Sequence, residues 1–131
     1  MDDALDVALE RDVASDHPII VLFAVSHPNV RIPDYVPNEL VAYNDHCVSI
    51  GTRYAGDGAT KVRMSRNIPD RAEHKVFAGV LRTPSGRLSV STSDATPVLI
   101  ATVGAEQASV RVYVDDLSEP ARVDIEVAGL A

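Results

Sequence analysis

Residues 109–127 read SVRVYVDDLSEPARVDIEV, and this stretch decides the fold class. Valine or isoleucine takes every second position around Val112 and again around Ile125, with polar or charged residues between them. Successive side chains of a strand point to opposite faces, so this period of two predicts two strands that each bury one face. The acids and Pro120 between the two segments are typical of a solvated turn.

Strands of the same kind are predicted along most of the chain. They cover residues 19–25, 48–53, 61–66, 76–81, 88–92, 97–103, 110–114 and 123–127. The runs 19–25 and 97–103 are continuously apolar, which predicts strands buried on both faces. Residues 54–58 contain Asp-Gly, a signal for a tight hairpin turn. We therefore predict a mainly β, single-domain antiparallel β-sandwich of about eight strands over residues 17–131.

Residues 1–16 and 38–43 do not show this strand pattern. In residues 1–16, Leu5, Leu9 and Val13 recur every fourth position behind several aspartates, which predicts a short amphipathic helix or a flexible acidic tail. Residues 38–43 are expected to form one or two helical turns between the prolines upstream and the Asn44-Asp45 turn.

Composition narrows the possible partners. The 131 residues carry a net charge of −7, which disfavours nucleic acid and anionic lipid and favours a basic protein partner. The chain has one cysteine, Cys47, so no internal disulfide is possible, and a reducing compartment is expected. With a longest apolar run of only residues 19–25, no membrane span is predicted, and the cytoplasm is the expected location.

Charge is segregated along the chain. Residues 1–52 hold nine acids and two bases, residues 53–87 hold eight bases and three acids, and residues 88–131 hold seven acids and two bases. One interpretation is that opposite charges meet across strands on the solvent faces of the sheet and help fix strand pairing. The other is that the acidic ends form a docking surface for a basic partner.

No pattern predicts a catalytic, metal or cofactor site. His17 and His27 each precede a proline, and their spacing fits no local metal motif. His46 and Cys47 are neighbours whose side chains would point to opposite faces of a strand, so they are not expected to act as a base and a nucleophile. A buried structural thiol is the expected role of Cys47.

One stretch resembles a known family. Residues 36–103 run through VPNEL, DHCVSIGT, VRM, VFAGVL and GRLSV, and this order of strands and turns resembles the competence protein J family. The family comprises small acidic proteins that inhibit a nuclease acting when DNA enters the cell, and similar immunity-type proteins. The resemblance implies a β-rich protein that blocks an enzyme by covering a basic cleft with acidic side chains. Asp115, Asp116 and Glu119 are the candidate partner-binding residues, because they cluster in one loop.

The first functional hypothesis is thus a non-enzymatic interaction module, an inhibitor or immunity protein for a basic enzyme such as a nuclease or toxin. The alternative is a structural or small-ligand-binding sandwich that self-associates as a homo-oligomer.

Overall fold

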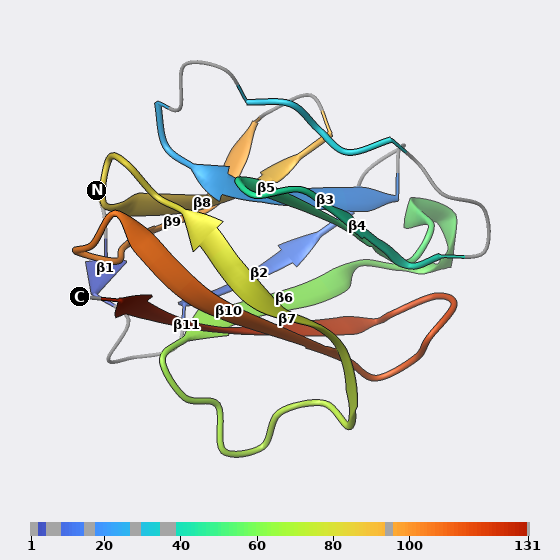
Figure 1. Ribbon diagram of the computed structural model, residues 1–131. Coiled ribbons are helices and arrows are strands. Elements are labelled where there is room, and N and C mark those ends of the chain that lie inside the picture. The colour runs from blue at the N-terminus through green and yellow to red at the C-terminus, as the bar shows by residue number, and fades with distance from the viewer. Residues whose placement is uncertain are drawn as a thin grey trace.

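The alternating apolar segments build two stacked β-sheets in the computed structural model (Figure 1). The structure describes residues 3–4, 9–14, 18–26, 30–34, 39–93 and 96–130. The first sheet has the strand order β1-β9-β8-β3-β5-β4, and the second has the order β2-β6-β11-β10-β7. Within the described ranges, the structure contains no helix with the length and hydropathy needed to span a lipid bilayer.

The strand bounds are as follows. The first sheet contains β1 (Asp3–Ala4), β9 (Pro97–Thr102), β8 (Arg87–Thr92), β3 (Ile19–Ala24), β5 (Cys47–Gly51) and β4 (Val41–Tyr43). The second contains β2 (Leu9–Val13), β6 (Thr60–Ser65), β11 (Arg122–Leu130), β10 (Gln107–Val114) and β7 (His74–Arg82).

The core lies between the two sheets and is aliphatic. Val112 of β10 and Ile125 of β11 are fully buried, and so are Ile20 and Leu22 on the facing sheet. The predicted sandwich and the predicted inward faces of β10 and β11 are confirmed, but the described sheets have six and five strands in place of a predicted total of about eight. Because apolar burial is the main favourable term in folding, these inner faces hold the layers together.

The N-terminal prediction was wrong for the part of residues 1–16 that the structure describes. Residues 9–13 form β2, an edge strand that pairs antiparallel with β6, from Leu9 opposite Met64 to Val13 opposite Thr60. Four is also a multiple of two, so the spacing of Leu9 and Val13 fits a strand as well as a helix. Hydrogen bonding to β6 favours the strand. The helical turns predicted over residues 38–43 are likewise replaced, because Val41–Tyr43 form β4 against β5.

The Asp57-Gly58 turn does not make a hairpin. A 3-10 turn, η1 (Ala55–Asp57), carries the chain from β5 in one sheet to β6 in the other. Gly58 has the expected positive φ, 119°, but here that conformation serves a turn that crosses between the sheets. The next strand, β6, then lies parallel to β11, so the sheet is not wholly antiparallel.

Strand β9 buries one face, not two. Leu99 and Ala101 are buried, whereas Val98 and Ile100 are only half-buried and Thr102 is exposed. The strand lies near the edge of the first sheet, with only the two-residue β1 beyond it.

Opposite charges of β6 and β11 meet across the two strands, as the first of the two interpretations of the charge pattern requires, but they do so inside the protein. Arg63 and Asp124 lie opposite each other in the parallel pair, with Nε 2.7 Å from Oδ1 and Nη2 3.1 Å from Oδ2. Asp124 is fully buried and Glu126 is 2% exposed, so the expectation that they face solvent was wrong. The connection from β6 to β7, residues 66–73, folds over both carboxylates and buries its own Ile68 there.

Backbone hydrogen bonds fasten this connection to the two buried acids. The Ile68 N–H donates to Glu126 Oε2 at 2.8 Å, and the Ala72 N–H donates to Asp124 Oδ2 at 2.7 Å. Arg71 lies over the Tyr113 ring, with its guanidinium carbon 4.8 Å from the ring centroid. The outer face of the second sheet thus has a small polar core of its own.

Asp124→Asn tests this polar core. Burial opposes ionisation of Asp124, but hydrogen bonds from Arg63, Arg122 and the Ala72 N–H outweigh it and hold the pKa below its usual 3.8. A depressed pKa stabilises the fold above that value, and the contribution is lost as pH falls through the folded-state pKa. We expect Asp124→Asn to lower the free energy of unfolding by about 3 kcal/mol at neutral pH. Urea titrations at pH 7 and below pH 4 measure both effects, and the variant should lose less stability on acidification.

Asp70→Asn is the matched control, because Asp70 also pairs with Arg63, at 3.1 Å, but is 74% exposed. Exposed ion pairs contribute little, so this variant should unfold like the wild type. Equal effects from the two substitutions would contradict the assignment of the stabilisation to the buried carboxylate.

Candidate protein-binding surface

The residues with nucleophilic or metal-binding chemistry are used structurally. Cys47 begins β5 and is fully buried, and this burial raises the pKa of its thiol to about 12. A thiol with that pKa is protonated at neutral pH and is a poor nucleophile. The structure describes no group of three or more His, Cys, Asp or Glu side chains that would hold a metal ion. His17 and His27 lie outside the described residues.

His46 connects three segments of the fold. Its Nε2 accepts a hydrogen bond from the Arg31 N–H at 3.0 Å, and its Nδ1 lies 2.8 Å from Asp45 Oδ1. Because Nε2 is an acceptor, the ring proton sits on Nδ1 and points to Asp45. Asp45 Oδ2 in turn lies 3.3 Å from Arg82 Nε at the end of β7. Hydrogen bonding from His46 therefore holds the pKa of Asp45 below its usual value, with help from Arg82.

The predicted acidic residues lie in the loop between β10 and β11, and residues 115–119 are all exposed. Asp116 Oδ1 accepts hydrogen bonds from Ser118 N at 2.8 Å, Ser118 Oγ at 2.9 Å and Glu119 N at 2.9 Å. Asp115 Oδ1 accepts from the N–H groups of Ala121 and Arg122, both at 3.0 Å. The two carboxylates are thus held in place by the backbone, and the hydrogen bonds from Glu119 and Ser118 lower the pKa of Asp116.

A hydrophobic residue stands in the middle of this acidic loop. Leu117 is 59% exposed, and together with Ser118 it borders a hollow of about 520 Å³. The other walls come from residues of β3, β4 and β5 and from Pro18, Pro33 and Glu39. The loop therefore offers an apolar side chain flanked by fixed negative charges, beside an open hollow.

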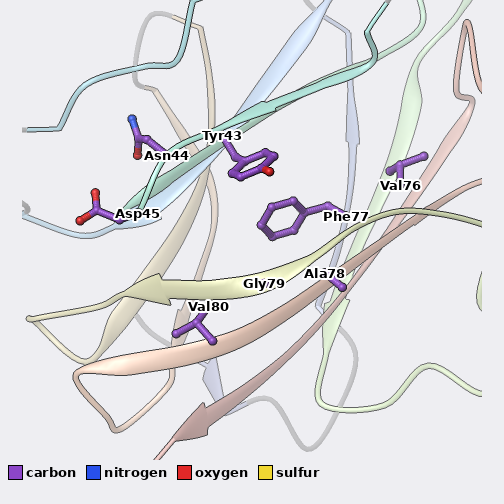
Figure 2. A pocket seen from close by; sticks show the side chains of 8 residues that line it. All are labelled: Tyr43, Asn44, Asp45, Val76, Phe77, Ala78, Gly79 and Val80. Atoms are coloured by element: carbon purple, nitrogen blue, oxygen red, sulfur yellow. The ribbon is translucent and has the colours of Figure 1, made fainter.

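A second hollow, of about 500 Å³, opens where the edges of the two sheets meet (Figure 2). Tyr43 of β4 and Phe77 of β7 face each other across it, with ring centroids 5.1 Å apart and ring planes at 61°. Asp45 stands at one end, and Val80 of β7 borders it. The hollow is an opening on the side of the sandwich, framed by one edge strand of each sheet.

Exposed apolar side chains gather around these hollows. Val80 is 51% exposed, Tyr43 65%, and Ile32 40% beside a third hollow next to β4. An exposed apolar patch with a polar rim is typical of protein-binding surfaces. The sequence prediction named the loop acids but missed these residues. Leu117 was visible as a leucine within a polar turn, whereas Tyr43 and Val80 look like ordinary strand residues.

Comparison with known proteins identifies a solved structure with a similar fold. No protein-family model matches the chain, and no curated protein matches it in sequence. Among solved structures, the crystal structure of ComJ from Bacillus subtilis, an inhibitor of the DNA degrading activity of NucA, matches with a TM-score of 0.63. The match covers 95% of this chain and 96% of ComJ at 15% sequence identity. The fold of this chain is similar to that of ComJ.

The ComJ likeness confirms the resemblance inferred from the order of strands and turns. At 15% identity it concerns the fold, and the roles of individual residues do not transfer with it. No finding tests Asp115, Asp116 and Glu119 as contacts, so they stay a prediction.

Asp116→Ala tests the order of the acidic loop. Removing the carboxylate deletes the acceptor for the Ser118 and Glu119 N–H groups, so both amides should exchange hydrogen faster. Asp116→Asn keeps an acceptor oxygen at Oδ1 and should preserve slow exchange. Amide hydrogen exchange by NMR measures this, and equal exchange in both variants would show that the side chain does not order the loop.

Proposed function

We propose that this chain is a non-enzymatic inhibitor that binds a basic enzyme, a nuclease in the first instance, within the cytoplasm. The observation that supports this most is the likeness to ComJ, a nuclease inhibitor, over nearly the full length of both chains. The net charge of −7 agrees with a partner whose substrate is itself a polyanion. An enzyme that binds nucleic acid needs a positively charged cleft, and such a cleft attracts an acidic protein.

The acidic loop is the proposed contact. Asp115, Asp116 and Glu119 form no ion pair with any described residue, so their charge faces solvent. Because Asp115 and Asp116 are already ordered by backbone hydrogen bonds, binding would lose less side-chain entropy than with free acids. Leu117 supplies an apolar anchor at the centre, with the charged residues as its rim.

The test starts with affinity capture from the native lysate at low and then moderate salt. We expect one dominant basic protein, held less firmly as salt rises, because screening weakens exposed charge pairs. Its DNA-degrading activity should fall on titration with this chain. The triple variant Asp115→Asn, Asp116→Asn, Glu119→Gln should inhibit with at least about ten-fold lower affinity, mainly through slower association. The amide side chains keep the Oδ1 acceptors, so the loop should stay ordered.

Glu106→Gln is the matched control. Glu106 is an exposed acid at the opposite end of β10 from the loop, so this variant should inhibit like the wild type. Equal losses in both variants would indicate a general charge effect without a defined contact. Full DNA-degrading activity in the presence of excess wild-type chain would overturn the inhibitor proposal.

A further inference from the structure

Of the four strands that end the two sheets in the described part of the chain, β7 differs from the rest. β1 has two residues and β4 has three, and β2 is five residues long with three charged, exposed side chains at its centre. β7 runs for nine residues, and its central stretch, residues 76–81, carries no charge. Proteins protect sheet edges by shortness and by charge, and the middle of β7 has neither.

The backbone of β7 presents unused hydrogen-bonding groups at this edge. Its one neighbour is β10, and alternate residues of an antiparallel strand direct their N–H and C=O groups away from that neighbour. The Arg82 N–H donates to the Asp45 carbonyl at 3.0 Å, so Arg82 belongs to the outward set. By the same alternation, Val80 and Ala78 also direct both groups outward, and no described strand pairs with them.

The hollow beside this edge is suited to apolar side chains. Figure 2 shows Tyr43 and Phe77 above the strand, with Gly79 between Ala78 and Val80. A Cβ atom added to Gly79 would lie 2.9 Å from Phe77 Cζ, so the Phe77 ring already covers the position that a side chain would fill. A strand added next to β7 would place alternate side chains against Phe77 and Tyr43, between the sheets.

The charged residues on the face of β7 away from the Tyr43–Phe77 hollow indicate which kind of partner would bind. Lys75 and Arg82 are exposed at the two ends of the strand, and Arg111 lies opposite Ala78 on β10. Lys75 forms no ion pair with the described residues, whereas Arg82 and Arg111 each have one acidic partner. An added strand would therefore meet one unpaired positive charge on this face, that of Lys75. A second copy, paired antiparallel through β7, would bring Arg82 of one chain close to Lys75 of the other.

We infer that the β7 edge at Ala78 and Val80 binds an extended segment of a partner protein by strand addition, and that this segment alternates apolar with acidic residues. The backbone groups of Ala78 and Val80 supply the hydrogen bonds, the Tyr43–Phe77 hollow takes the apolar side chains, and Lys75 attracts the acidic ones. The Val80 end of this surface is separate from the acidic loop, because Val80 pairs with Ser109, about 20 Å along β10 from Asp115 at strand spacing, whereas Lys75 pairs with Tyr113 and lies nearer that loop.

A blocked eight-residue peptide of alternating valine and glutamate is the probe, and NMR titration is the readout. We expect shifts at Ala78, Gly79 and Val80 and slower amide exchange at Ala78 and Val80. Val80→Pro removes one outward N–H and leaves the bonds to β10, since proline is tolerated on an edge strand. This variant should bind the peptide at least about ten-fold more weakly. Val80→Thr keeps the N–H and the branched shape, and should bind like the wild type.

Two further measurements keep the inference falsifiable if Val80→Pro unfolds. Lys75→Glu should weaken binding of the glutamate peptide and strengthen binding of the matching peptide of valine and lysine. Sedimentation equilibrium should report a monomer. A dimer that Val80→Pro abolishes would assign the edge to a second copy and overturn the inference, as would shifts that avoid residues 78–80 or equal binding of both peptides. None of these outcomes depends on the acidic loop, so they are independent of the inhibitor proposal.

Discussion

The buried carboxylate of Asp124 ties two strands of the second sheet to the connection that crosses its outer face. It pairs with Arg63 on the parallel strand β6 and accepts the Ala72 N–H from the connection to β7. That connection has to carry the chain from β6 past β11 and β10 to the far edge, where β7 begins. A buried charge is costly unless it is fully hydrogen-bonded, so the connection that bonds it is also held in one position. Beyond this connection, β7 pairs with β10 and forms the edge of the sheet.

The sequence predicted the class of the fold because alternation is a local property. Val112 and Ile125 reveal their buried faces to any reader who knows that strands have a period of two. The pairing of strands is not local. Leu9 and Val13 satisfy a helical spacing and a strand spacing equally, and only Met64 and Thr60, more than 40 residues away, select the strand. Gly58 has the same ambiguity. A hairpin turn and a turn that crosses between the sheets both require a positive φ at this glycine, so its presence did not distinguish them.

The sequence predicted the candidate site only as far as its charge pattern indicates which residues are exposed. Acids between two strands belong in a solvated turn, and Asp115, Asp116 and Glu119 are exposed as that rule implies. Asp124 and Glu126 followed the same alternation yet are buried, because residues 66–73 cover them and no sequence pattern announced that cover. The opening between Tyr43 and Phe77 depends on which strands end the sheets, and this is decided by topology.

These contacts explain part of the separation of charge along the chain. Part of the basic middle segment is neutralised by pairing within the molecule, since Arg63, Arg71 and Lys61 each pair with an acid from a terminal segment, the first two with buried carboxylates and Lys61 with the half-exposed Glu10. Acids are in excess over the whole chain, and Asp115, Asp116 and Glu119 of the β10–β11 loop are among the described acids that form no ion pair. Lys75 is a base of the middle segment that forms no ion pair with a described residue, and it lies on β7, the longest edge strand among those the structure describes. Pairing within the sheets and exposure to partners are therefore not alternatives: the first determines which charges remain for the second.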